Sequence, residues 1–213
     1  MRKILSIVTT VLFLGIGSAM AETGMGITGN FASVEASGSE TLRNGGDTTS
    51  GSIDNDVVVP EIFIELIGDR GALGVAYIPV QELGKKSRSD SNTRGDTGTY
   101  TANAEVDSHV MVYGDLNLTE MGGQTIYAKG GIAHAKISTL EDLNSGSTYK
   151  DQNVWGTTIG LGMKGDLGSG GLYYKLDVTK TVYDEYRDTN STGNQIKADT
   201  DIVSGKVSLG YKF

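Results

Sequence analysis

The sequence predicts an all-β protein, an eight-stranded antiparallel β-barrel that spans a membrane, and three observations support this fold class. Segments of about ten residues alternate apolar with small or polar side chains, which gives each strand one face for lipid and one for a polar lumen. Eight such segments are present, and a closed single-chain barrel of this kind has an even number of strands. The connections between them alternate in length, which predicts short periplasmic turns and four long extracellular loops.

The candidate strands are the segments 24–36, 57–67, 72–82, 99–116, 124–138, 153–164, 171–183 and 202–213. The short connections are 68–71, 117–123 and 165–170, and the long polar ones are 37–56, 83–98, 139–152 and 184–201. A soluble β-sandwich also contains many short strands, but it has no reason to alternate its loop lengths so regularly.

The amino terminus predicts export from the cytoplasm. A short basic start is followed by the apolar segment 4–17 and by the small-residue motif Ala19-Met20-Ala21, so residues 1–21 are expected to be a removed signal peptide and 22–213 the barrel. A retained transmembrane helix is the alternative, but the apolar segment is shorter than the roughly 18 residues that a span needs.

Charge and cysteine content narrow the classes of partner and of site. The chain has 26 Asp and Glu against 18 Lys and Arg, so nucleic acid is not an expected partner. It contains no cysteine, which excludes disulfide bonds and thiolate metal sites.

The second and third strands predict their own pairing. A two-residue turn at Asp69-Arg70 places three pairs of apolar residues on one side of the hairpin, namely Leu66 with Leu73, Ile64 with Val75, and Ile62 with Tyr77. The same register sets Pro60 opposite Pro79. Because proline cannot donate a ladder hydrogen bond, we expect the hairpin to open or bulge near its outer rim.

The fourth and fifth strands are less regular. In 99–116 the lipid face is expected to hold Ala102, Ala104, Val106, Val110, Val112 and Leu116, and the lumen to hold Asn103, Glu105, Asp107, His109 and Tyr113. In 124–138 the charge of Lys129 predicts that it points inward. The apolar residues of this strand do not stay at alternate positions, on one face of the strand, as far as Ile137. We therefore expect a bulge here.

The last three strands alternate more clearly. Strand 153–164 places Trp155, Ile159, Leu161 and Met163 outward, and strand 171–183 places Leu172, Tyr174, Leu176, Val178 and Val182 outward. Trp155 and Tyr174 are expected at the membrane interfaces, where amphipathic rings are favoured. In 202–213, Val203, Val207, Leu209, Tyr211 and Phe213 share one face.

The segment Thr125-Ile126-Tyr127-Ala128-Lys129-Gly130-Gly131 and the ending Val207-Ser208-Leu209-Gly210-Tyr211-Lys212-Phe213 resemble small outer-membrane barrels of Gram-negative bacteria. The groups concerned are the OmpA-type transmembrane domain and the opacity-protein porin-like proteins. The resemblance implies a location in the outer membrane, and Tyr211 and Phe213 resemble the signal that the barrel-insertion machinery reads. It departs from the OmpA type because no soluble peptidoglycan-binding domain follows Phe213, and it carries no activity by itself.

Parity assigns ten ionisable residues to the lumen, which are Glu61, Glu65, Glu105, Asp107, His109, Lys129, Lys164, Lys175, Asp177 and Lys206. An eight-stranded barrel is barely wide enough for its side chains, so charges of both signs are expected to pair across it. The pairs would then form a plug, and the alternative is a gated or water-filled narrow path lined by the same groups.

No catalytic residue, metal site or cofactor is predicted. His134 and Ser138 are four residues apart, which on a strand is about 13 Å and too far for direct proton transfer. His109 has only Glu105 and Asp107 at alternate positions near it, which suits a hydrogen-bonded lumen residue better than a metal site.

The loop segment 85–96 is basic, because it holds Lys85, Lys86, Arg88 and Arg94. These side chains are candidates for binding the phosphates of lipopolysaccharide, and neutralisation by the acidic segment 184–201 is the alternative. We therefore expect a monomeric outer-membrane barrel in contact with lipid and lipopolysaccharide, with a structural or surface-interaction role. The alternative function is a narrow porin for ions or very small solutes.

Overall fold

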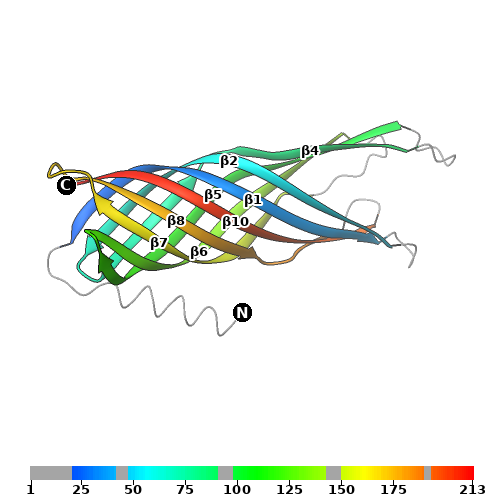
Figure 1. Cartoon of the computed structure of the whole chain (residues 1–213). Coiled ribbons are helices and arrows are strands. Elements are labelled where there is room, and N and C mark those ends of the chain that lie inside the picture. The colour runs from blue at the N-terminus through cyan, green and yellow to red at the C-terminus, as the bar shows by residue number, and fades with distance from the viewer. Residues whose placement is uncertain (1–20, 42–47, 91–97, 143–149, 190–192) are drawn as a thin grey trace.

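The computed structural model describes residues 21–41, 48–90, 98–142, 150–189 and 193–213, and nearly all of them lie in strands of one antiparallel sheet (Figure 1). The strands in these ranges are β1 (Glu22–Thr41), β2 (Thr48–Gly68), β3 (Gly71–Ile78), β4 (Gln81–Asp90), β5 (Gly98–Met121), β6 (Gln124–Asp142), β7 (Gln152–Asp166), β8 (Leu172–Tyr183), β9 (Tyr186–Thr189) and β10 (Gln195–Lys212). The described part of the chain holds no helix that is long and apolar enough to cross a membrane.

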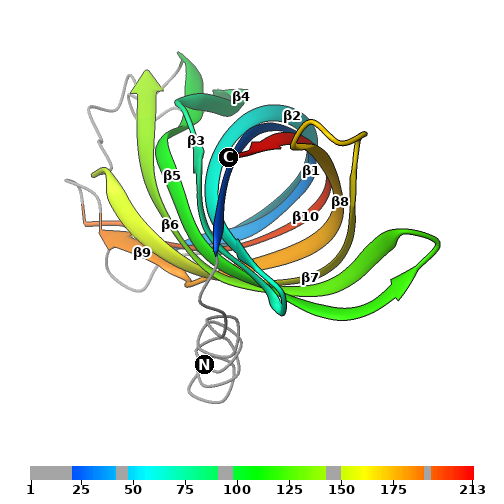
Figure 2. The ribbon, with the colours of Figure 1, turned by 90° about the vertical axis from the view of Figure 1, so that its left-hand side faces the viewer.

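The sheet closes into a barrel, which is seen end-on in Figure 2. The strand order is β1-β2-β3-β5-β6-β7-β8-β10, and β10 pairs with β1 to complete the ring. β4 follows β3 on the same side of β5, and β9 follows β8 on the same side of β10, so neither adds a strand to the circumference. The predicted eight-stranded all-β barrel is therefore confirmed.

The last residue takes part in the closure. The Phe213 N–H donates to the carbonyl oxygen of Thr23 at 2.9 Å, and the Thr23 N–H donates to the carbonyl oxygen of Phe213 at 3.2 Å. From Gly24 opposite Lys212 to Thr41 opposite Gln195, the β1–β10 ladder then continues without a shift. Closure leaves no sheet edge exposed along this seam, as the membrane interior requires.

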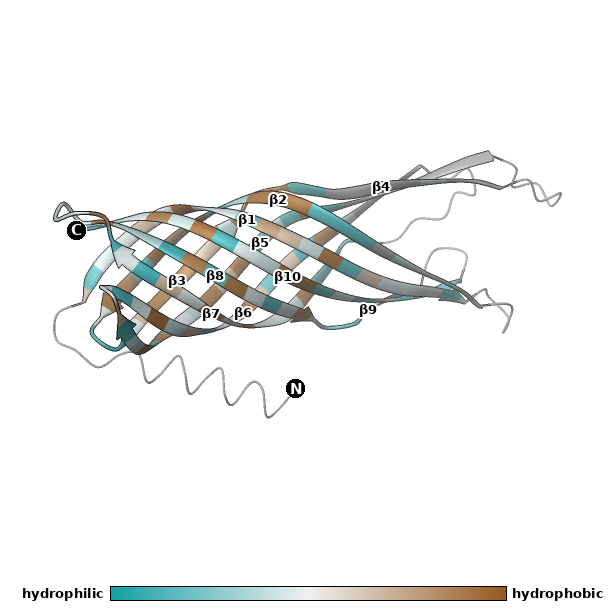
Figure 3. Ribbon diagram, in the orientation of Figure 1, coloured by the Kyte–Doolittle hydropathy of each residue, from teal (hydrophilic) through white to brown (hydrophobic). Residues whose placement is uncertain are grey.

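Hydrophobic and hydrophilic residues alternate along the strands of the barrel wall (Figure 3). On β10, Val203, Val207 and Leu209 are exposed, whereas Ser204, Lys206 and Ser208 are buried. The same alternation runs along β8, where Leu176 and Val178 are exposed and Lys175 and Asp177 are buried. The predicted lipid faces of these two strands are confirmed.

The β2–β3 hairpin has the predicted register, with Leu66 opposite Leu73, Ile64 opposite Val75 and Ile62 opposite Tyr77. The β2–β3 ladder ends at that last pair, and β3 ends at Ile78. Pro79 and Val80 lie outside any strand, and β4 then pairs with β5. The expectation that the hairpin opens near the two prolines is confirmed.

The strands extend well beyond the predicted boundaries. Much of the four segments expected to be long loops is strand, and the turn expected over 117–123 is reduced to Gly122 and Gly123 between β5 and β6. Alternation marks a strand only where one face meets lipid and the other a polar lumen. Outside the membrane both faces meet water, so the polar extensions carried no such signal.

The irregularity expected on 124–138 lies instead on its neighbour. β6 pairs with β7 without a shift from Thr125 opposite Lys164 to Ile137 opposite Gln152. β5 has register shifts between Val106 and Ser108 and between Asn117 and Thr119. The expectation of a bulge in β6 is wrong, because Ile137 keeps the same inward parity as Lys129 and lines the lumen.

The two-residue turn between β5 and β6 depends on glycine. Gly122 and Gly123 have φ values of 62° and 79°, a left-handed conformation that side chains with a Cβ rarely adopt. Two consecutive positive φ values give a primed turn, whose twist matches that of the flanking strands.

We expect Gly123→Val to lower the free energy of unfolding by roughly 1–2 kcal/mol, because valine is strained in this conformation. Urea titration of the protein in lipid vesicles measures the loss. Gly205→Val is the control, since a Cβ at Gly205 meets no atom within 4 Å. Equal losses for the two variants would contradict the assignment of the turn.

Candidate functional site

The half of the lumen nearest the short turns, the inner half, is filled by buried charged side chains. Lys175 of β8 lies at the centre, with its Nζ 2.6 Å from Glu65 Oε2 and 2.7 Å from Asp115 Oδ2. Lys175 is 2% exposed and Asp115 is 1% exposed. The Lys175 ammonium on β8 thus contacts carboxylates from β2 and β5, and these contacts link three strands across the lumen.

A second lysine extends this cluster toward β6. Lys129 Nζ lies 3.0 Å from Asp115 Oδ1 and 3.7 Å from Asp177 Oδ1, and 4.0 Å from the centre of the Tyr113 ring. Asp177 also accepts a hydrogen bond from the Tyr127 hydroxyl at 2.6 Å. We call the five residues Glu65, Asp115, Lys129, Lys175 and Asp177 the inner network.

Tyrosine side chains fill the space around the inner network. Two hydroxyls donate to Glu65, that of Tyr113 at 2.7 Å and that of Tyr173 at 2.8 Å. Each ring packs on a strand position without a side chain, where a Cβ would lie 2.4 Å from the ring: Tyr113 on Gly74, Tyr127 on Gly162 and Tyr173 on Gly210. These glycines allow large rings to occupy a lumen that is otherwise too narrow.

The charges of the inner half balance. Glu65, Asp115 and Asp177 face Lys129 and Lys175, and the Nζ of half-buried Lys164 lies 5.6 Å from the centre of the Tyr127 ring. Further from the short turns than the inner network, Lys206 Nζ forms an ion pair with Glu61 Oε2 at 2.7 Å, and both side chains are buried. In the described residues no group of His, Asp or Glu side chains is arranged to hold a metal ion.

The structure brings together most of the residues that parity assigned to the lumen. Glu65, Lys129, Lys175 and Asp177 form the inner network, Glu61 pairs with Lys206, and Lys164 lies beside Tyr127. His109 also faces inward, and its ring packs edge-on against Tyr183 with centroids 6.3 Å apart.

Two residues differ from their expected place. Asp107 forms an ion pair with partly exposed Lys136, and Glu105 lies within hydrogen-bonding reach of Asp107. The cause is the bulge at Asp107, which reverses the parity of the preceding residues. Val106 therefore lines the lumen, and the prediction that Asp107 and Glu105 face it is wrong.

Sequence reasoning missed Asp115, although this residue contacts both lysines of the inner network. Asp115 lies within the predicted strand 99–116, but it was not included among the lumen residues. Its odd number matches the inward parity of Tyr113, so the alternation along this strand was a sufficient signal.

The remaining candidates lie away from the lumen or outside the described residues. Tyr211 and Phe213 are exposed on the lipid face near the short turns. Arg94 lies in the segment 91–97, which the structure does not describe, and the side chains of Lys85, Lys86 and Arg88 on β4 are outside the described part as well. His134 packs against Trp155, with ring centroids 4.7 Å apart.

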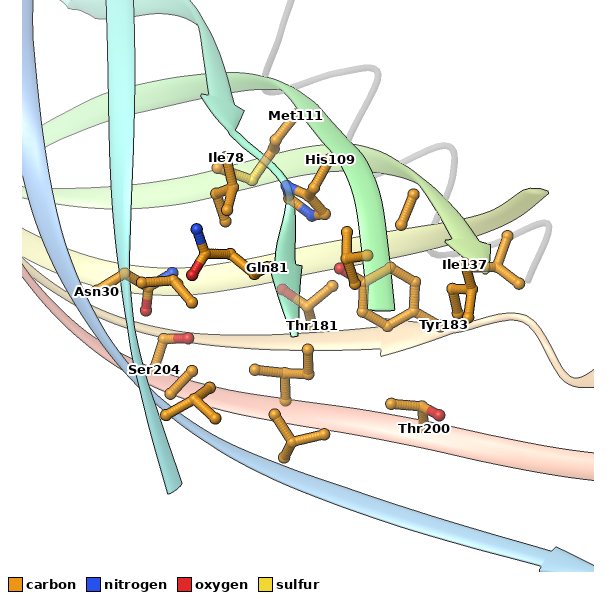
Figure 4. Close-up of a pocket in the computed structure, with 18 of the residues that line it drawn as sticks. Asn30, Ile78, Gln81, His109, Met111, Ile137, Thr181, Tyr183, Thr200 and Ser204 are labelled. Atoms are coloured by element: carbon orange, nitrogen blue, oxygen red, sulfur yellow. The ribbon is translucent and has the colours of Figure 1, made fainter. Parts of the chain in front are cut away.

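The outer half of the lumen, toward β4 and β9, contains a pocket with apolar walls (Figure 4). Its cavity volume is about 100 Å³, and we call it the apolar pocket. Asn30, His109, Met111 and Lys206 lie at its inner end, directly beyond the inner network. The lumen is thus filled at one end and hollow at the other.

Comparison with known proteins supports the fold. No family model and no curated protein matches the chain. Among solved structures, the outer-membrane protein AlkL in lipid bilayers has a TM-score of 0.51 and 13% identity, covering 92% of each chain. OprG from Pseudomonas aeruginosa has a TM-score of 0.48 and 16% identity, covering 91% of this chain and 96% of OprG. Ail from Yersinia pestis has a TM-score of 0.45 and 10% identity, covering 90% of this chain and 99% of Ail.

The closed barrel, its apolar outer face and the likeness to AlkL define an outer-membrane β-barrel protein. The chain has the small porin-like barrel fold expected from the sequence, with an apolar outer face that fits a membrane.

We expect Lys175→Met to lower the free energy of unfolding by about 3–5 kcal/mol, because it leaves two buried carboxylates without their shared cation. Urea titration in lipid vesicles measures the change. Lys180→Met is the matched control on the same strand, since its ammonium is largely exposed and pairs with Asp201 at 2.9 Å. That variant is expected to change stability little. A Lys175→Met loss as small as that of the control would contradict the buried network.

Proposed function

We propose that this protein is a non-conducting outer-membrane barrel with a structural or surface-interaction role at the cell envelope. The observation that carries the proposal is the inner network, in which two lysines and three carboxylates are buried across the full width of the lumen. We further propose that the protein acts as a monomer and performs no catalytic chemistry.

The inner network disfavours the alternative of a narrow porin. A permeating ion would have to separate buried charge pairs, and breaking such a pair costs several kcal/mol. Tyr127 is completely buried beside Asp177, so the space around the charges is filled by side chains. A porin of this size would instead need a continuous hydrated path between the two ends.

We expect the refolded protein to show no stepwise conductance in a planar lipid bilayer. The double variant Tyr113→Ala with Tyr127→Ala removes the two rings that fill the inner half, and we expect it to open small conducting events. Tyr77→Ala is the control, because Tyr77 is exposed on the lipid face and its removal leaves the lumen unchanged. Stable openings of the wild-type protein, with its folding verified, would support the porin alternative and contradict the proposal.

The surface role is assigned to the strand extensions and the segments that join them. β1 and β2 remain paired from the barrel wall to Thr41 opposite Thr48, which supports a hairpin that reaches beyond the apolar belt (Figure 1). We propose that the basic segment with Lys85, Lys86, Arg88 and Arg94 binds lipopolysaccharide phosphates, since lysine and arginine form charge-assisted hydrogen bonds with phosphate. The exposed residues Tyr211 and Phe213 are proposed as the signal for the barrel-insertion machinery.

We expect the triple variant Lys85→Gln, Lys86→Gln and Arg88→Gln to bind labelled lipopolysaccharide several-fold more weakly than wild type. The difference should shrink as salt is added, because salt screens exposed charges. Lys197→Gln, an exposed lysine on β10, is the control and should bind as wild type does. Unchanged binding by the triple variant at low salt would contradict this surface assignment.

A further inference from the structure

The apolar pocket departs from the pattern of its own fold class. In outer-membrane barrels the residues that face the lumen are ordinarily polar. Here the outer half of the lumen is lined by Ala32, Val59, Ile78, Val106, Ile137 and Val154, which come from six different strands. A concave cavity whose walls are mainly apolar and that carries a few polar groups is characteristic of a small-molecule site.

Two buried polar atoms at the inner end of the apolar pocket lack a partner. Within the described residues, neither Asn30 Oδ1 nor His109 Nδ1 has a hydrogen-bond partner, and Asn30 is only 4% exposed. Both residues line the pocket (Figure 4), and Asn30 lies opposite Lys206 in the β1–β10 ladder. A buried group that lacks its hydrogen bond is costly, so a ligand hydroxyl that reaches one of these atoms would be bound favourably.

The charges that line the apolar pocket favour an uncharged ligand. Apart from His109 and the neutral phenols of Tyr183 and Tyr186, the ionisable residues among its described lining are Lys206 and Asp184. Lys206 is already paired with Glu61 at 2.7 Å, and Asp184 is exposed at the mouth. A carboxylate placed at the inner end would find no unpaired cation there, and burial of an unpaired charge is strongly unfavourable.

We propose that the apolar pocket binds an uncharged, mainly aliphatic molecule with a terminal hydroxyl group, of the class of long-chain alcohols. The hydroxyl lies at the inner end near Asn30 and His109, and the chain follows the walls toward the mouth. This inference goes beyond the proposed structural role and rests on it in one respect, because the inner network provides the closed floor of the pocket.

The experiment measures binding of radiolabelled n-decanol to the mature protein in lipid nanodiscs, with empty nanodiscs as the background. We expect saturable binding of about one molecule per barrel above that background. Ala32→Trp, which places a large side chain in the pocket, should abolish it, and Val34→Trp is a second blocking variant if the first does not fold. Val58→Trp is the matched control, because Val58 is exposed on the lipid face.

Competition tests the polar end of the site. Decanoate and n-decylamine should displace n-decanol at least tenfold less effectively than unlabelled n-decanol does. Asn30→Leu combined with His109→Leu should weaken n-decanol binding up to about tenfold, the effect of losing a hydrogen bond to the hydroxyl.

Absence of saturable binding by folded wild-type protein, equal competition by decanoate, or unchanged binding in the folded blocking variants would each overturn the inference. These outcomes do not depend on conductance. A barrel that conducts ions would contradict the proposed function, whereas failure to bind n-decanol would leave that function in place.

Discussion

The rest of the structure depends on the pairing of buried charges inside a very narrow barrel. Eight strands enclose a lumen that side chains can just fill, so a lysine that points inward must find a carboxylate within reach. Lys175 meets this constraint by contacting Glu65 and Asp115, which lie on β2 and β5 while Lys175 lies on β8. Each contact therefore spans the lumen, and together the contacts fix the relative positions of strands that are not neighbours in the sheet.

The same constraint divides the lumen into two halves with different chemistry. In the inner half three tyrosine rings fill space between the strands, and glycine at Gly74, Gly162 and Gly210 provides the room for them. In the outer half many of the wall residues are valine, alanine and isoleucine, which form no ion pairs across the lumen, and a cavity remains. The inner half supports the proposal of a barrel without a conducting path, and the outer half contains the apolar pocket.

Much of the barrel could be predicted from the sequence, because lipid on one side and charged groups on the other impose alternation. The lumen positions of Lys175 and Asp177 followed from alternation, and that of Lys129 followed from its charge. The β2–β3 register followed from a two-residue turn that pairs apolar residues on one face. Parity could not reveal the bulge at Asp107, where one extra residue reverses the faces of β5. It also misplaced the irregularity near Ile137, since apolar residues on the lumen side of β6 were taken as a sign of a bulge. These apolar residues line the apolar pocket. The expectation that residues facing the lumen are polar does not anticipate such a pocket.

The most direct test of the central claim is the accessibility of single cysteines at two depths of the lumen. The chain contains no cysteine, so each introduced thiol is the only one present. Thr200→Cys lies near the mouth of the apolar pocket, whereas Ser208→Cys lies on the same strand opposite Lys175. With a membrane-impermeant thiol reagent applied to protein in lipid vesicles, we expect the first cysteine to react and the second to remain unmodified from either side. Equal reaction of both would contradict a filled inner half.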